Sequence, residues 1–255
     1  MNKKPNSCAY CPSSGPFTKE HIWPKSLIRK YEELHTFNPR TNKFYTGEAV
    51  IKDVCATCNN DKLSPLDTYL TKLFDASFGR VLQPGESANL EFDYSLLLRG
   101  LLKISYNSAR AFSDTKTKTL HAQFANHILQ GGYCPKIMLR LQVVTSSKVR
   151  NLIDGSEEIW SPDAMRCAVI KYDGPLASRF CIRMVAINSF WFYLIIPYKQ
   201  EPNHKWDEFL HGFSNWITPP GILLEKSTCT LHIQKEKTTY LHPTLLGSLL
   251  HADST

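Results

Sequence analysis

Residues 8–26 read CAYCPSSGPFTKEHIWPKS, and residues 49–62 read AVIKDVCATCNNDK. Two Cys-x-x-Cys pairs mark this region, Cys8 with Cys11 and Cys55 with Cys58. The short turn of such a pair directs both thiolates at one ion, so two pairs supply the four ligands of a tetrahedral zinc ion. Four separate buried thiols are the alternative interpretation. The spacing therefore predicts a structural zinc site.

Polar residues suited to hydrolysis lie between and just after the two pairs. Glu20 and His21 are adjacent, and Asn59 directly follows the last cysteine of the second pair. An imidazole can accept a proton near neutral pH, and carboxylate and carboxamide oxygens suit a hard cation such as Mg²⁺. Neighbouring residues of a strand face opposite sides, so the strand must bend for Glu20 and His21 to share a site.

The ordered set of these residues resembles the HNH, or ββα-metal, endonuclease superfamily, particularly its zinc-stapled members such as the phage Holliday-junction resolvases. The resemblance covers roughly the first quarter of the chain. It implies that Glu20 is a metal ligand, that His21 is the general base, and that Asn59 is a second ligand to the same Mg²⁺ or Mn²⁺ ion. The family often has histidine at a third position, which here is Asp67, a candidate third ligand. The residues that carry the resemblance are Cys8, Cys11, Thr18 to Ser26, Cys55, Cys58, Asn59, Asn60 and Lys62.

The composition favours a polyanionic partner. The chain of 255 residues has 30 Lys and Arg against 23 Asp and Glu, a formal net charge of +7. DNA is the predicted partner, although nothing in the motif discriminates against the 2′-hydroxyl of RNA. The candidate phosphate-binding residues are Lys25, Arg40, Lys43 and Lys62.

The same sequence gives expectations about location. No apolar signal segment follows the N-terminus, and the longest apolar run, residues 190–197, is too short to span a bilayer. Eight cysteines fit a reducing compartment, with four on zinc, although extracellular disulfides are an alternative. We therefore expect a cytoplasmic protein that does not bind membranes.

The predicted fold is α+β, with a zinc-stapled ββα-metal module over residues 1–82 and a larger α+β domain over residues 83–255. In the first domain we expect strands at 17–22 and 49–54, a long loop over 32–50, and a helix that begins at Cys58 and is capped by Asn or Asp. The second domain should place two helices against a mostly antiparallel sheet. Those helices are 92–112, whose Lys103 and Arg110 we expect on a solvated face, and 118–130; the strands are 137–144, 168–172, 179–187, 190–196 and 228–234.

These observations predict a metal-dependent endonuclease that hydrolyses phosphodiester bonds in DNA. Roles in restriction, phage defence or mobile-element biology are typical of the family, and residues 83–255 would recognise the target, dimerise or bind a protein partner. Two alternatives remain open. One is a non-catalytic zinc module that binds nucleic acid or protein, and the other is an HNH nuclease that cleaves RNA.

Overall fold

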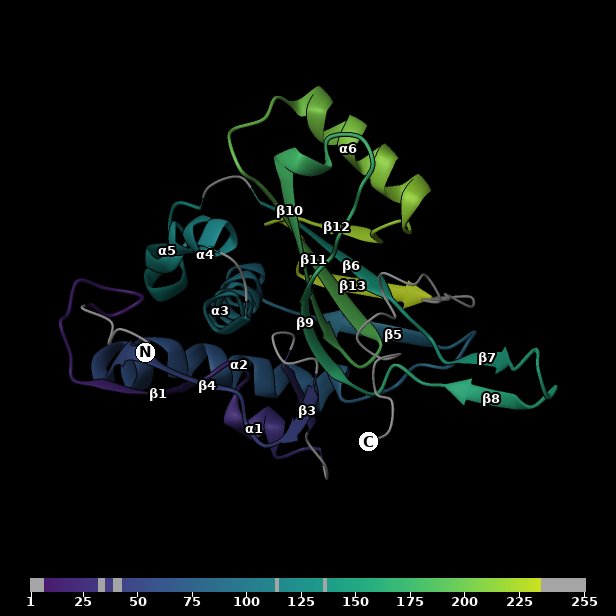
Figure 1. The fold of residues 1–255 in the computed structure, drawn as a ribbon, viewed down its shortest axis with the longest axis horizontal. Coiled ribbons are helices and arrows are strands. Elements are labelled where there is room, and N and C mark those ends of the chain that lie inside the picture. Colours follow the sequence, from purple (N-terminus) through teal and green to yellow (C-terminus); the bar gives the residue numbers. More distant parts are fainter. Residues whose placement is uncertain (1–6, 32–34, 39–42, 113–114, 135–136, 235–255) are drawn as a thin grey trace. The chain divides into compact units, whose positions relative to one another are not determined.

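A computed structural model describes residues 7–31, 35–38, 43–112, 115–134 and 137–234 (Figure 1). Its fold is mixed α+β, and it divides into two compact units. Unit 1 is Met1–Lys72, Ser95–Lys136 and His251–Thr255, and unit 2 is Leu73–Tyr94 and Ile137–Leu250. The predicted domains meet at a single boundary between residues 82 and 83. The two units instead alternate along the sequence, because the chain leaves unit 1 after Lys72 and returns to it at Ser95.

Unit 1 contains an antiparallel pair of strands that carries Glu20 and His21. Strand β1 (Phe17–His21) pairs with β4 (Val50–Cys55), with Phe17 opposite Cys55 and His21 opposite Val50. Both predicted strands are thus confirmed. The register shifts between Thr18 and Glu20, and such an irregularity re-aims the side chains that follow it. Glu20 is buried as a result of this arrangement, whereas His21 stays partly exposed.

The predicted helix after the second cysteine pair is present. It begins as a π-helix, η1 (Thr57–Leu63), and continues as α2 (Ser64–Leu73). The expected start at Cys58 with an Asn or Asp cap is wrong, because Ala56 is the N-cap and no side chain caps the helix. Pro65 lies where η1 passes into α2, and since it has no backbone N–H it donates no helical hydrogen bond at this point.

The expected long loop over residues 32–50 contains a second hairpin. Strand β2 (His35–Asn38) pairs with β3 (Lys43–Thr46), and a short helix, α1 (Lys25–Ile28), precedes them. The loop prediction is therefore wrong for these two strands.

Three helices complete unit 1. The predicted helix 92–112 is α3 (Tyr94–Phe112), and the predicted helix 118–130 is two shorter helices, α4 (Thr115–Ala122) and α5 (Ala125–Gln130). We expected these helices to belong to the sheet domain, but they belong to unit 1. The physical reason is the polar face of α3, which bonds to buried groups of β1 and β4, as described below.

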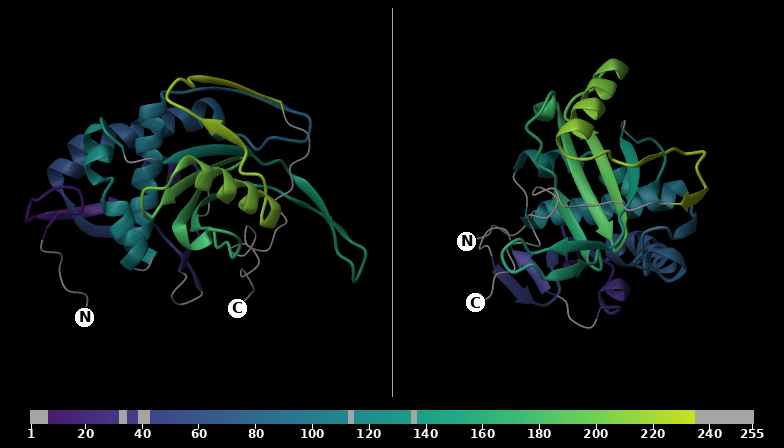
Figure 2. Two further views of the ribbon diagram at one scale, coloured as in Figure 1. Left: turned by 90° about the horizontal axis from the view of Figure 1, so that it is seen from above. Right: turned by 90° about the vertical axis from the view of Figure 1, so that its right-hand side faces the viewer.

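Unit 2 is built on a five-stranded antiparallel sheet in the order β12-β6-β11-β10-β9, so the predicted antiparallel sheet is present. The predicted strand 228–234 is not part of it, because β13 (Thr230–Gln234) pairs with β5 (Ser87–Glu91) instead, and the edge strand β12 was not predicted. The predicted hairpin is confirmed, since β10 and β11 are joined through Asn188 and Ser189. Helix α6 lies beside this sheet (Figure 2). Its Trp206, Phe209 and Phe213 are buried in one hydrophobic core with side chains of β10 and β11. The strands are β6 (Met138–Val143), β9 (Met165–Val169), β10 (Phe180–Ile187), β11 (Phe190–Pro197) and β12 (Ile222–Leu224), and α6 is Asn203–Trp216.

The remaining elements of unit 2 are short. β5 (Ser87–Glu91) pairs with β13 (Thr230–Gln234), and β7 (Ser147–Arg150) pairs with β8 (Glu157–Trp160) in a hairpin that extends away from the sheet (Figure 1). The helical turns η2 (Phe74–Phe78) and η3 (Ala177–Arg179) complete it. None of the described helices has both the length and the apolar character needed to cross a bilayer.

Candidate metal centre and active site

The four cysteines of the two pairs lie together at one end of β4. The sulfur atoms of Cys8, Cys11, Cys55 and Cys58 all lie within 4.8 Å of one another, and those of Cys11 and Cys55 are 3.7 Å apart. A tetrahedron with Zn–S bonds of about 2.3 Å has ligand atoms about 3.8 Å apart. The four thiols therefore fit a zinc ion, as the spacing predicted.

Hydrogen bonds fix this cluster to the strand. The Cys8 sulfur accepts backbone N–H groups from Cys55 at 3.3 Å and from Tyr10 at 3.5 Å, and the Ala9 N–H donates to the Asp53 carbonyl at 2.8 Å. Burial acts to raise the pKa of the Cys55 thiol, but hydrogen bonds from the Cys58 backbone and from the other thiols outweigh it and lower that pKa to about 7. The site thus favours at least one thiolate near neutral pH, which is the form that binds zinc.

The second cysteine pair brings Asn59 back to strand β1. Its Nδ2 donates to the Lys19 carbonyl at 2.9 Å and to Thr18 Oγ1 at 2.9 Å. Within the described part of the chain, no hydrogen bond is formed by the side-chain oxygen Oδ1 of Asn59. Asn59 therefore lies beside the residue that precedes Glu20, with an oxygen available as a ligand.

A carboxylate that the sequence did not reveal holds His21. The Nε2 atom of His21 lies 2.6 Å from Glu48 Oε2, and the His21 side chain is 22% exposed. An ionised carboxylate only accepts hydrogen bonds, so in the neutral imidazole a proton on Nε2 serves this contact and leaves Nδ1 as the nitrogen that can accept one. One signal for Glu48 was its position in the strand pair. It lies two residues before Val50, the first residue of β4, and Val50 is opposite His21.

Glu20 is buried and bound by two residues of α3. Lys103 Nζ lies 2.7 Å from Glu20 Oε1, and Asn107 Nδ2 donates to the same oxygen at 3.0 Å. Lys103 also donates to Asp67 Oδ1 at 2.5 Å. The expectation that Lys103 and Arg110 lie on a solvated face is wrong, because their side chains are 0% and 8% exposed. These cations face inward because the buried Glu20 carboxylate of β1 and the partly exposed Asp53 and Asp67 carboxylates of β4 and α2 offset the cost of their desolvation.

The Lys103 ammonium connects Asp67 to Glu20, because it bonds to both carboxylates. Burial raises the pKa of the Asp67 carboxyl, while Lys103 beside it acts in the opposite direction. His21 also interacts electrostatically with this carboxyl. The structure thus gathers the three predicted residues Glu20, His21 and Asp67 around one charged cluster.

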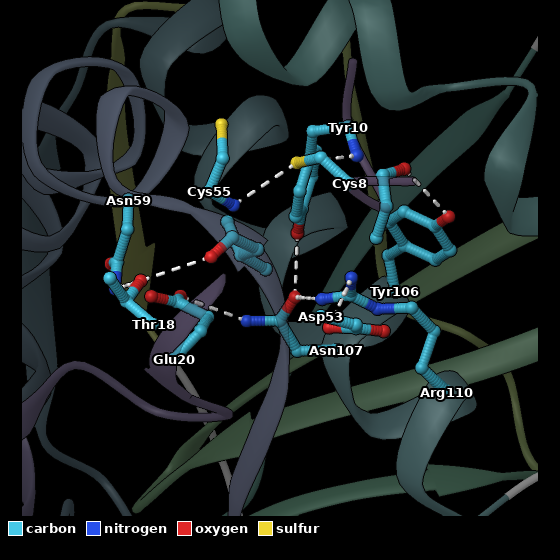
Figure 3. Close-up of polar contacts among 12 residues, drawn as sticks. Cys8, Tyr10, Thr18, Glu20, Asp53, Cys55, Asn59, Tyr106, Asn107 and Arg110 are labelled. Carbon is cyan, nitrogen blue, oxygen red and sulfur yellow. Dashed lines mark hydrogen bonds and ion pairs between the residues drawn. The ribbon is translucent and has the colours of Figure 1, made fainter. Parts of the chain in front are cut away.

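Asn107 connects this cluster to the cysteine site (Figure 3). Its Oδ1 accepts the Tyr10 hydroxyl at 2.6 Å and Arg110 Nη2, while its Nδ2 also donates to the His21 carbonyl at 3.0 Å. Burial raises the pKa of Tyr10 well above its ordinary value, so its hydroxyl keeps the proton that it donates. One side chain of α3 therefore bonds to the turn of the first cysteine pair and to the strand of Glu20.

Arg110 strengthens the same connection. Its guanidinium donates to Asp53 Oδ1 at 3.1 Å and lies over the rings of Tyr10 and Tyr106, 4.9 and 4.5 Å from their centroids. The Tyr106 hydroxyl donates to the Ala9 carbonyl at 3.0 Å. Three polar residues of α3 thus hold the cysteine turn and β4.

Comparison of the chain with protein-family models, curated proteins and solved structures found no match.

Two oxygen atoms are suited to a hard divalent cation. Glu20 Oε2 and Asn59 Oδ1 form no hydrogen bond to any residue that the structure describes, and both atoms are ligand types that Mg²⁺ and Mn²⁺ accept. Among the described residues, the four-cysteine set is the only group of three or more His, Cys, Asp or Glu side chains close enough to hold one ion. A divalent cation would thus need water molecules to complete its ligands.

The predicted phosphate-binding residues are only partly described. Lys25 and Lys62 are exposed in unit 1. Arg40 lies outside the described residues, and so does the side chain of Lys43.

Proposed function

We propose that the chain is a metal-dependent endonuclease of the HNH type that hydrolyses phosphodiester bonds in DNA. The observation that carries this proposal is the position of Asn59. The four-cysteine site ties the start of helix η1 to β4, and Asn59 then bonds to the Lys19 carbonyl, next to Glu20 and His21. Two strands followed by a helix, with these three side chains at their junction, are the arrangement that the HNH resemblance implies.

Each residue has a role that follows from its contacts. His21 would take a proton from the attacking water at Nδ1, with Glu48 holding the ring through Nε2. Glu20 Oε2 and Asn59 Oδ1 would hold Mg²⁺ or Mn²⁺, which when bound neutralises phosphate charge and stabilises the leaving oxygen. The zinc ion would have no chemical role in the reaction and would fix Asn59 relative to β1.

The net charge of +7 and the exposed Lys25 and Lys62 support a nucleic-acid substrate. DNA is the substrate typical of the family, in settings such as restriction, phage defence or mobile elements. Unit 2 would recognise the target, form a homodimer or bind a partner protein. A double-strand cut by one active site per chain needs two chains or two successive nicks, which light scattering under cleavage conditions can separate.

One observation favours a different function. Lys103 neutralises Glu20 and Asp67, which is compatible with a zinc module that binds nucleic acid without cutting it. The deciding experiment is cleavage of supercoiled plasmid with Mg²⁺ or Mn²⁺ by zinc-loaded wild type, His21→Ala and a matched control, His204→Ala, which alters an exposed histidine of α6.

The endonuclease proposal expects metal-dependent nicking by wild type and the control, and loss of nicking with retained DNA binding in His21→Ala. DNA binding without cleavage by any of the three would favour the binding module. Cleavage of a matched RNA, but not of the plasmid, would change the substrate class and keep the site.

A further inference from the structure

Among the described residues, Lys103 is the one cation with a fully buried side chain in the charged cluster of unit 1. It lies in the middle of α3, far in sequence from the two cysteine pairs, and its side chain is 0% exposed. Its ammonium bonds to Glu20 Oε1 at 2.7 Å and to Asp67 Oδ1 at 2.5 Å. A cation of the chain itself thus lies between two of the three predicted divalent-metal ligands.

Burying a lysine is costly unless its charge is compensated, and here two carboxylates compensate it. The reverse also holds, because the buried Glu20 carboxylate and the partly exposed Asp67 carboxylate would repel each other without a cation between them. A purely structural ion pair would do no more than stabilise its own members. The position beside the candidate divalent site gives Lys103 a further consequence.

We propose that Lys103 is a positioning residue whose ammonium holds Glu20 Oε1 and Asp67, so that these oxygens bind the ammonium instead of a divalent cation. Lys103 thereby limits how tightly the site binds Mg²⁺ or Mn²⁺. This inference rests on the proposed endonuclease function. It assigns only Glu20 Oε2 and Asn59 Oδ1 to the divalent cation, and it assigns Asp67 to Lys103.

The physical argument is electrostatic. A divalent cation bound at Glu20 Oε2 would lie a few ångströms from the ammonium on Oε1, and like charges at such a distance repel. Asn107 donates to the same Oε1 and holds that oxygen in place. Removing the positive charge while leaving both carboxylates would create a more acidic site, so the affinity for a divalent cation should rise. A residue needed only for folding would lower that affinity when removed.

The test measures Mn²⁺ binding to the full chain, saturated with zinc so that the thiols are occupied, by loss of the free-ion signal in electron paramagnetic resonance. Lys103→Met removes the charge, Lys103→Gln removes it but keeps a hydrogen-bond donor, and Lys103→Arg keeps the charge. Lys72→Met is the matched control, because Lys72 is an exposed lysine of α2. Zinc content and near-ultraviolet circular dichroism establish that each variant is folded.

We expect the neutral variants to bind Mn²⁺ at least ~10-fold more tightly than wild type, with Lys103→Arg and the Lys72 control unchanged. If Lys103→Met does not fold, Lys103→Gln carries the test. Equal or weaker binding by the folded neutral variants, or no Mn²⁺ binding by any protein, would overturn the inference. Tighter binding without plasmid cleavage would keep the Lys103 assignment and contradict the endonuclease proposal.

Discussion

Asn107→Ala should uncouple the cysteine turn from the strand that carries Glu20. The substitution removes two acceptor bonds, from Tyr10 and Arg110, and two donor bonds, to Glu20 and to the His21 carbonyl. A net hydrogen bond contributes about 1 kcal/mol, and one to a charged group contributes about 1.5–3 kcal/mol. Two of these bonds involve charged groups, so we expect the free energy of unfolding of unit 1 to fall by up to about 5–8 kcal/mol.

The assay is equilibrium unfolding in urea, followed by zinc release to a chromogenic chelator, which reports on unit 1. Asn60→Ala is the matched control, because Asn60 is an exposed asparagine of η1. Exposed substitutions usually change stability by no more than about 0.5 kcal/mol. A loss below about 1 kcal/mol in Asn107→Ala, or one equal to the control, would refute the view that α3 joins the two parts of the site.

Three further results are expected from the same unit. Verified removal of zinc should abolish the cooperative melting of unit 1, since structural zinc contributes folding free energy; an unchanged melting curve would argue against that role. Burial raises the pKa of Cys58, so the metal-free thiol keeps its proton at neutral pH and zinc must displace that proton. The apparent zinc affinity should therefore rise with pH, by about tenfold per pH unit for each proton displaced. A flat affinity profile from about pH 6 to 8 would count against this. Glu48→Ala should lower the cleavage rate by roughly tenfold or more, part of the factor of 10²–10⁴ that general-base catalysis supplies, without loss of zinc; an unchanged rate would remove Glu48 from the site.

The local part of the site was predictable from sequence. Each Cys-x-x-Cys pair determines its own geometry over a few residues, and Asn59 is the next residue after Cys58. When the four cysteines come together, Asn59 is therefore placed beside β1. The strand pair β1 and β4 followed from the same closure. Short-range constraints of this kind are visible in a single sequence.

The contribution of α3 was not predictable in the same way. Helical periodicity identifies a face but not the element that it meets, and Lys103 and Arg110 looked like surface residues because most lysines and arginines are exposed. Their partners, Glu20 and Asp53, are far away in sequence. Only the tertiary structure shows that these carboxylates compensate the buried cations.

Helix α6 was a different kind of omission, because its signal was present. Trp206, Phe209 and Phe213 recur at helical spacing, and Pro202 precedes the first helical residue. The predicted strands 190–196 and 228–234 flank this segment, for which no helix was predicted.

The most direct test of the central claim is to measure zinc content and Mg²⁺-dependent DNA cleavage on the same samples of wild type and Glu20→Gln. The claim is that unit 1 separates a structural zinc, held by four thiols, from a catalytic divalent cation held at Glu20. It predicts that Glu20→Gln keeps one zinc ion per chain, remains folded and no longer cleaves. Cleavage at the wild-type rate by the zinc-loaded variant would contradict the assignment of Glu20 and, with it, the proposed active site.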